Sequence, residues 1–155
     1  MLVQREDFDV AAEIARLTGA RVDGGIDASL GIGAVATFTG YCRDEGGRLA
    51  ALELEHYPGM AEAAIARVAA QAEARWPLAG LTIIHRFGRM APGERIVLVA
   101  AASSHRAAAF EAASFMMDYL KTTAPFWKKE HVAEGGPAGW VEERQADVAA
   151  AQRWR

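Results

Sequence analysis

Five basic side chains that could bind an anion lie at three separate places in the sequence. Arg43 closes a predicted strand beside a glycine-containing turn, and His105 with Arg106 begins a predicted helix. Because the first turn of a helix has free backbone N–H groups and a positive partial charge, it binds anions well. Lys121 and Lys128 flank the segment TTAPFW. The five predict an anion site if the fold brings them together; otherwise they are solvated cations and a capping histidine.

Lys121 has surroundings in which a lysine can do chemistry. At helical spacing it lies near Phe110, Ser114 and Met117, at the border between the polar line and the apolar stripe of its predicted helix. A lysine half-buried beside other cations loses affinity for its proton and can act as a nucleophile or base. The simpler interpretation is a lysine near a helix C-terminus that pairs with Asp118.

The remaining reactive side chains have simple structural interpretations. Lys128 and Lys129 form a basic pair that could clamp an anion or protect an edge strand from aggregation. Cys42 has an arginine next to it, which favours a thiolate, but a lone cysteine in a strand is more often a small buried hydrophobe. His56 and His85 lie in apolar-leaning strands and are interpreted as hydrogen-bonded structural residues. No spacing of histidines predicts a metal site.

The elements that must position these residues predict an α+β fold. Consecutive short strands without long crossovers favour a mixed or antiparallel sheet, and we interpret the first two strands as a hairpin. Pro58 suits a first helical turn, Ser103 and Ser104 offer a helix cap, and residues 21–33 predict a loop. Helices are expected over residues 7–19, 58–76, 105–123 and 146–154, and strands over 33–43, 49–57, 81–88, 94–103, 125–132 and 139–144.

The composition excludes several classes of protein. A length of 155 residues predicts one domain over residues 1–155, with room for two lobes. A net charge of -3 gives no global attraction to nucleic acid or to an anionic membrane. No apolar run reaches the roughly 18 residues that cross a bilayer, and no signal peptide is visible, so we expect a cytoplasmic protein. A single cysteine excludes an internal disulfide framework and a multi-cysteine zinc site.

Five long segments resemble the large, catalytic subunit of molybdopterin synthase. They follow that family's order and spacing, from about residue 34 to GWVE and beyond, whereas the first thirty or so residues match weakly. The segments are VATFTGYCR (35–43), LELEHYPGMAE (52–62), RWPL (75–78) followed by LTIIHRFG (81–88), SSHRAAAFEA (103–112) and MDYLKTTAPFWKKE (117–130).

The resemblance implies a sulfurtransferase with an α/β-hammerhead fold and no cofactor. The family converts cyclic pyranopterin monophosphate into molybdopterin, a dithiolene. Sulfur arrives as a thiocarboxylate on the C-terminal Gly-Gly of a small ubiquitin-like subunit, whose tail threads into a pocket of the large subunit. The resemblance also implies that two large subunits form a homodimer within a heterotetramer.

The resemblance assigns roles to particular residues as well. Lys121 matches the lysine closest to the incoming thiocarboxylate, and Lys121 with Lys128 is the implied catalytic pair. The implied substrate-binding residues are Tyr41, Cys42, Arg43, His105, Arg106, Lys121, Lys128, Lys129 and Glu130. Tyr41 departs from the family, which often has a basic residue there, so we expect any contact from Tyr41 to use its backbone. Cys42 matches an ordinary strand position.

Three other functions fit parts of this pattern. A non-catalytic scaffold could dock a ubiquitin-like protein, but it has no need for the whole cationic set. An unrelated enzyme could use Lys121 to form a Schiff base, which borohydride would trap with a carbonyl substrate. Nucleic-acid binding is disfavoured by the acidic net charge and by the lack of a long basic stripe.

Overall fold

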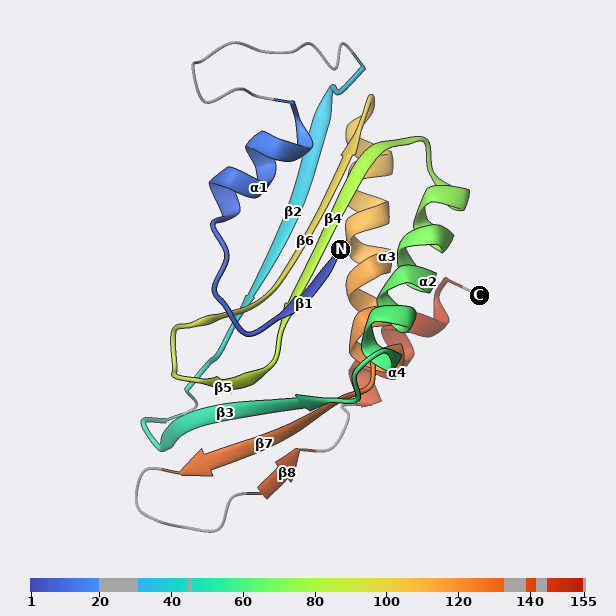
Figure 1. Cartoon of the computed structure of the whole chain (residues 1–155). Helices are drawn as coiled ribbons and strands as arrows, with labels where there is room; N and C mark the ends of the chain where they lie inside the picture. Colours follow the sequence, from blue (N-terminus) through green and yellow to red (C-terminus); the bar gives the residue numbers. More distant parts are fainter. Residues whose placement is uncertain (20–30, 45, 133–138, 142–144, 155) are drawn as a thin grey trace.

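The computed structural model describes residues 1–19, 31–44, 46–132, 139–141 and 145–154, which form helices and two β-sheets (Figure 1). Most of the predicted loop at 21–33 lies outside the described residues. The strands are β1 Leu2–Gln4, β2 Ala34–Tyr41, β3 Leu49–His56, β4 Leu78–Arg86, β5 Gly88–Met90, β6 Arg95–Ser103, β7 Phe126–Val132 and β8 Gly139–Val141. The helices are α1 Val10–Leu17, α2 Met60–Arg75, α3 Arg106–Thr123 and α4 Gln145–Gln152.

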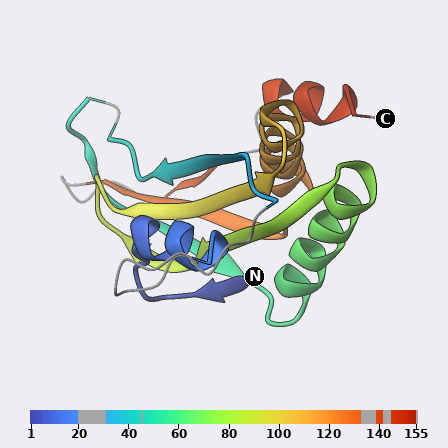
Figure 2. The ribbon, with the colours of Figure 1, turned by 90° about the horizontal axis from the view of Figure 1, so that it is seen from above.

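The first sheet has the strand order β1-β4-β6-β2, with α2 and α3 on one face and α1 on the other (Figure 2). β6 pairs antiparallel with β4 and with β2, whereas β1 pairs parallel with β4, so the sheet is mixed as predicted. Successive side chains of a strand point to opposite faces. Val99 accordingly packs in the cluster that contains α2 and α3, while Leu98 packs with Phe8 beside α1 (Figure 2).

Helix α3 lies against the first sheet because most of its surface is apolar. Residues at helical spacing, among them Ala112, Phe115 and Met116, are buried against the sheet and α2. The helix ends at Thr123, since Pro125 disfavours the helical conformation at Ala124. This boundary agrees with the prediction.

The predicted serine cap of α3 is wrong. The N-cap residue is His105, and it makes no side-chain capping hydrogen bond. Ser103 lies in β6 instead, where its buried hydroxyl donates to the carbonyl of Pro77 at 2.9 Å. The same oxygen accepts a hydrogen bond from the His105 N–H at 3.4 Å, outside the helix. Pro58 also precedes α2 rather than entering its first turn, because Gly59 is the N-cap there.

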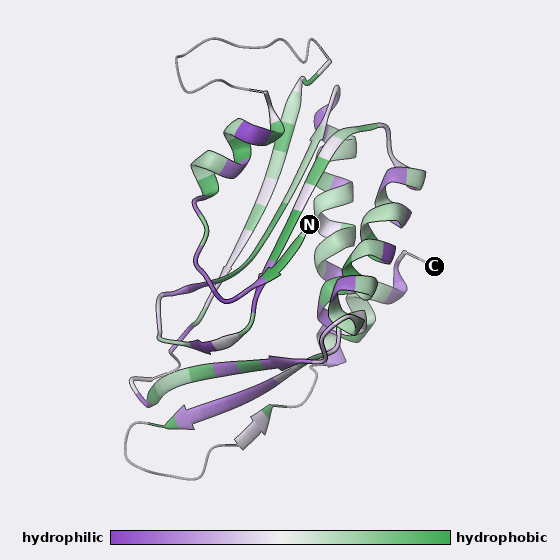
Figure 3. Ribbon diagram, in the orientation of Figure 1, coloured by the Kyte–Doolittle hydropathy of each residue, from purple (hydrophilic) through white to green (hydrophobic). Residues whose placement is uncertain are grey.

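The second sheet corrects the predicted hairpin between the first two long strands. Its order is β5-β3-β7-β8, so β2 and β3 belong to different sheets. β2 pairs with β6, and β3 pairs antiparallel with β5 and β7. An alternating strand pattern gives the buried face but not the partner strand. The strand that pairs with β2 is β6, which is longer and more apolar than β3. Figure 3 shows the resulting contrast between the hydrophilic β7 and the hydrophobic strands of the first sheet.

A small separate core joins the two sheets where β2 and β4 end. It contains Cys42, Leu54 and Met90, all of them buried. The backbone N–H of Cys42 donates to the carbonyl of Glu94 at 2.8 Å, and its carbonyl accepts from Gly93 at the same distance. The second sheet therefore lies across one end of the first, with its strands running crosswise in Figure 1.

Helix α4 returns the C-terminal segment to the lower end of α3. Trp154 packs edge-on against Phe115, with ring centroids 5.7 Å apart, and its Nε1 donates to Asp118 at 2.7 Å. Arg153 makes a further ion pair with Asp118 at 2.8 Å. Among the described residues, no helix is long and apolar enough to cross a membrane.

The aromatic core beneath α3 gives the first testable prediction. Phe115 is fully buried, so Phe115→Ala should lower the free energy of unfolding by about 3–5 kcal/mol through lost burial and a residual cavity. Tyr57 is 64% exposed, and Tyr57→Ala should change that free energy by less than about 0.5 kcal/mol. Urea unfolding of both variants measures the difference. Equal losses would contradict the assignment of Phe115 to the core.

Candidate functional site

A cavity of about 1450 Å³ lies where the first sheet, the second sheet and the end of α3 meet. Side chains from β2, β3, β4, β6, β7, β8, α3 and α4 line it, together with the segment that follows β2. The predicted site residues among them are Tyr41, Arg43, Lys121, Lys128 and Glu130. Predicted site residues from two distant stretches of the sequence, 41–43 and 121–130, thus share one cavity.

Lys121 enters this cavity from the last turn of α3. Its ammonium group lies 3.0 Å from a carboxylate oxygen of Asp147 on α4, and its side chain is 44% exposed. The pairing with Asp118 that the sequence offered as the simpler interpretation is wrong, because Asp118 is engaged by Arg153 and Trp154. Helix α4 therefore supplies the counter-charge of Lys121.

Lys128 and Glu130 line the cavity from β7 because they share one face of that strand. Lys128 stands opposite Leu54 and Glu130 stands opposite Leu52, and both leucines also line the cavity. Lys129 points to the other face, where its ammonium lies 5.7 Å from the ring of Trp140. Of the two adjacent lysines, only Lys128 is a lining residue.

Tyr41 and Arg43 reach the cavity from the end of β2, and Cys42 between them points into the protein. Cys42 is 2% exposed, with its sulfur 3.7 Å from the carbonyl of Met90. Burial, followed by the nearby acidic charges, raises the pKa of its thiol. The Cys42 side chain is thus a neutral part of the small core, as the simpler interpretation predicted.

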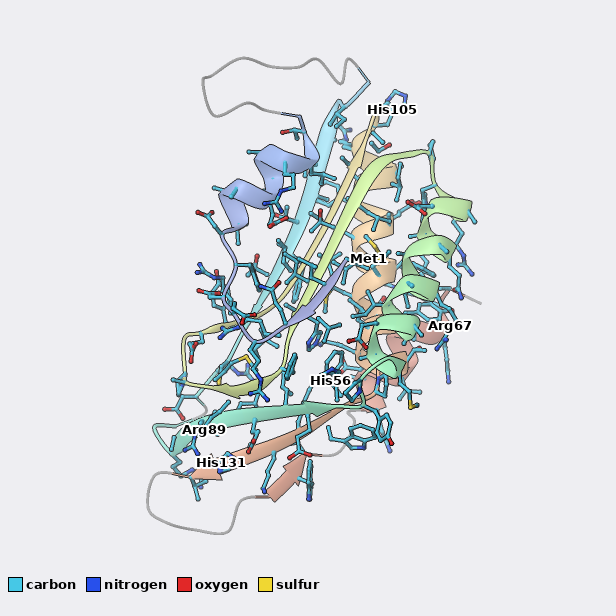
Figure 4. All side chains as sticks on the ribbon, viewed as in Figure 1. Met1, His56, Arg67, Arg89, His105 and His131 are labelled. Carbon is cyan, nitrogen blue, oxygen red and sulfur yellow. The ribbon has the colours of Figure 1, made fainter. Side chains whose placement is uncertain are left out.

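His105 and Arg106 lie at the opposite end of α3 from Lys121. Fifteen residues separate Arg106 from Lys121 along the helix, which corresponds to roughly 22 Å at about 1.5 Å per residue. Figure 4 shows His105 at the upper end of the molecule, with His56 and then His131 further down in the lower half. Neither His105 nor Arg106 lines the cavity of the same chain. Within one chain, the structure brings together three of the five basic residues and not the other two.

His85 is a cavity residue that the sequence reasoning treated as structural. It is 9% exposed and lines the cavity from β4. Its Nδ1 lies 2.9 Å from the carbonyl of Arg86, and its ring stacks on Phe126 with centroids 3.8 Å apart and planes 12° apart. Burial, aided by the charges of Lys128 and His56, lowers the pKa of His85 to about 4. The only sequence signal for it was a polar ring in an apolar strand.

The arrangement favours binding of an anionic ligand that also has an apolar part. Arg43, Lys121 and Lys128 are exposed at the rim, whereas Leu54 and Leu120 are buried on the floor. Cationic side chains with N–H donors bind phosphate oxygens well. Among the described residues, no group of three or more histidine, cysteine, aspartate or glutamate side chains could hold a metal ion.

Comparison with known proteins gives a consistent result over nearly the whole chain. A family model described as "MoaE protein" matches residues 3–123. The molybdopterin synthase catalytic subunit of Mesorhizobium japonicum is 63% identical over 153 residues, which cover 99% of this chain and 91% of that protein. The same subunit of Pseudomonas aeruginosa is 53% identical, with 98% of this chain and 96% of that protein covered.

Solved structures agree with these relatives. The MoaE protein of Burkholderia ambifaria has a TM-score of 0.78 at 48% identity, covering 99% of this chain and 95% of that chain. A molybdopterin synthase structure from Staphylococcus aureus has a TM-score of 0.76 at 27% identity, covering 90% of this chain and 95% of that chain. These likenesses bear out the predicted α+β fold.

The buried imidazole predicts how stability depends on pH. The pKa of His85 is about 4 in the folded chain against 6.5 for the free side chain, so the unfolded state takes up the proton first. Stability should therefore fall as the pH drops from about 6.5 to about 4, by at most about 3 kcal/mol from this group. His85→Gln should reduce that loss in urea unfolding at pH 7, 5.5 and 4.5. An unchanged pH dependence would argue against a buried neutral imidazole.

Proposed function

The chain belongs to the MoaE protein family, and from this premise we propose that it is the catalytic subunit of a molybdopterin synthase. In this proposal it transfers sulfur from the C-terminal thiocarboxylate of a small ubiquitin-like subunit to cyclic pyranopterin monophosphate, giving the dithiolene of molybdopterin. The observation that supports it most is that Arg43, Lys121 and Lys128, from separate stretches of the chain, line one cavity. The proposal also places the protein in the cytoplasm, where a small pterin substrate can diffuse to it.

The cations have distinct tasks in the proposed reaction. The substrate carries a cyclic phosphate, and opening it leaves charge on the phosphate oxygens, which Arg43 and Lys128 can stabilise. When the thiocarboxylate sulfur attacks a carbon of the substrate side chain, a C–S bond forms and a C–O bond of that carbon breaks, so the departing oxygen must be protonated. Water then hydrolyses the thioester, which leaves the sulfur on the substrate and a carboxylate on the small subunit, and the water must be deprotonated. Lys121 is the proposed acid and base, since its ammonium projects into the cavity from the end of a rigid helix.

The size of the cavity supports a partner tail in addition to a small ligand. Pockets for small molecules are typically about 300–1000 Å³, and this cavity of about 1450 Å³ exceeds that range. A Gly-Gly terminus has no side chains and therefore needs only a slender path. The name "catalytic subunit" of the relatives is in keeping with the presence of another subunit.

A homodimer would account for the distance of His105 and Arg106 from the cavity. β2 is an edge strand, and an apolar groove beside it, lined by Phe38, Phe110 and Met117, has a volume of about 320 Å³. If a second copy docks there across a twofold axis perpendicular to α3, the two α3 helices run antiparallel, and the start of one lies beside the end of the other. We propose that each complete site takes His105 and Arg106 from the partner copy, in a dimer within a heterotetramer.

Lys121→Ala tests the proposed acid–base group. The variant should lose sulfur transfer by about 10²–10⁴-fold while it stays folded, because a positioned proton-transfer group contributes about that much. The assay is molybdopterin formation from cyclic pyranopterin monophosphate and thiocarboxylated small subunit. Arg67→Ala, which removes an exposed cation on α2, is the matched control and should keep full activity. Full product formation by Lys121→Ala would refute the assignment.

Subunit mixing tests the shared site. Arg106→Ala and Lys121→Ala homodimers should each be nearly inactive. A purified heterodimer of the two variants should regain about half of the wild-type activity, since one of its two sites contains both native residues. Two different affinity tags allow the heterodimer to be isolated. A heterodimer as inactive as its parents would show that both residues act within one chain or that Arg106 acts elsewhere.

A further inference from the structure

The floor of the cavity, as far as the described residues line it, has a single polar side chain. Among the described residues that line the cavity, His85 is the only polar one that is buried, while the cations and Glu130 are exposed at the rim. Its neighbours on the floor, Leu54 and Leu120, are 1% and 4% exposed. A ligand that reaches the floor therefore meets hydrocarbon and one imidazole. No buried side-chain nitrogen or oxygen of the described residues lacks a hydrogen-bond partner, so a His85 ring nitrogen that the protein does not bond is open to the cavity and available to a ligand.

The hydrogen bond of Nδ1 fixes which kind of partner the ring can take. The carbonyl of Arg86 can only accept, so Nδ1, 2.9 Å away, carries the ring proton and donates it. In the neutral imidazole the other nitrogen, Nε2, then has a lone pair and no proton. The pKa of about 4, lowered chiefly by burial, keeps the ring in this neutral form at pH 7. His85 thus presents a hydrogen-bond acceptor in a cavity whose other polar groups are mostly donors.

The orientation of this acceptor is fixed before any ligand binds. The face of the His85 ring stacks on Phe126, with centroids 3.8 Å apart, which sets the ring plane. The backbone at Arg86 is held in turn, because its guanidinium donates to the carbonyls of Arg5 at 3.0 Å and Arg95 at 2.8 Å. A group that is ordered in advance costs little entropy on binding.

We propose that His85 is a substrate-binding residue whose Nε2 accepts a hydrogen bond from an N–H group of the pterin ring. This inference rests on the proposed function and deepens it. A pterin is flat, has N–H donors on its edge and can lie against the apolar floor. The phosphate at its other end then reaches the cations Arg43 and Lys128 at the rim. The cavity accordingly recognises the two ends of the substrate separately, the ring by His85 and the phosphate by cations.

Two variants of His85 separate hydrogen bonding from packing. His85→Phe keeps an aromatic ring for the stack on Phe126 but removes both nitrogens, and His85→Gln keeps an amide oxygen that can accept near the position of Nε2. Each is assayed in complex with thiocarboxylated small subunit, with cyclic pyranopterin monophosphate as substrate. Inorganic phosphate serves as a second probe, as a competitive inhibitor that reports on the rim alone.

The proposal predicts a split between the two probes. His85→Phe should raise KM about tenfold, with kcat changed less than about threefold, as expected for the loss of one ground-state hydrogen bond. His85→Gln should recover most of this loss. The inhibition constant for inorganic phosphate should stay unchanged in both variants, whereas Lys128→Ala should raise it. If His85→Phe weakens both probes equally, or neither, the proposed contact is wrong.

A measurement on the unmodified protein covers the case in which His85→Phe fails to fold. Long-range ¹H–¹⁵N spectra of the wild-type complex should show the Nδ1–H tautomer, and saturation with the pterin should shift the Nε2 resonance of His85 toward the hydrogen-bonded range. An unchanged resonance at saturation would overturn the inference alone. Absence of sulfur transfer by the wild-type complex would instead overturn the proposed function, so the two failures are distinguishable.

Discussion

The burial of α3 against the first sheet is the constraint on which the site depends. Seven residues of this helix are buried, and their packing fixes the rotation of the helix about its axis and its position along the sheet. Lys121 consequently leaves the last turn on the side of the cavity, and Pro125 forces the chain out of the helix directly afterwards. The chain then begins β7, so Lys128 returns to the same cavity within seven residues. One packed helix end thus sets the relative positions of both lysines.

The joint between the sheets fixes the other half of the cavity. Phe126 begins β7 in the second sheet but stacks on His85 in the first. The ring of His56 in β3 lies 4.3 Å, centroid to centroid, from the ring of Phe87, which follows β4. Beneath the rim, Cys42 and its partners form the small core that holds the end of β2. Because these contacts cross from one sheet to the other, the cavity is a property of their junction and not of either sheet.

Sequence reasoning predicted the elements well and their partners poorly. The hydrophobic periodicity predicted the bounds of α3 and β6 to within one residue. Long apolar patterns are reliable because they record which residues of an element are buried. The hairpin between β2 and β3 failed because alternation defines a face and leaves the neighbouring strand open. For the site, Lys121 and Lys128 were found from composition and resemblance. His85 was missed, because a histidine in an apolar strand has the same pattern whether it supports the core or borders a cavity.

Local charge explains why the bulk composition gave no hint of an anion site. The chain carries a net charge of -3, yet the described lining residues include four basic side chains, Arg43, Arg48, Lys121 and Lys128, against the two carboxylates Glu130 and Asp147. The excess of positive charge over the cavity attracts an anionic ligand. Asp147 already contacts the Lys121 ammonium at 3.0 Å, so an arriving phosphate or thiocarboxylate competes with this carboxylate. Because such an exposed ion pair contributes little stability, a ligand can replace the Asp147 carboxylate beside Lys121 at little cost in free energy.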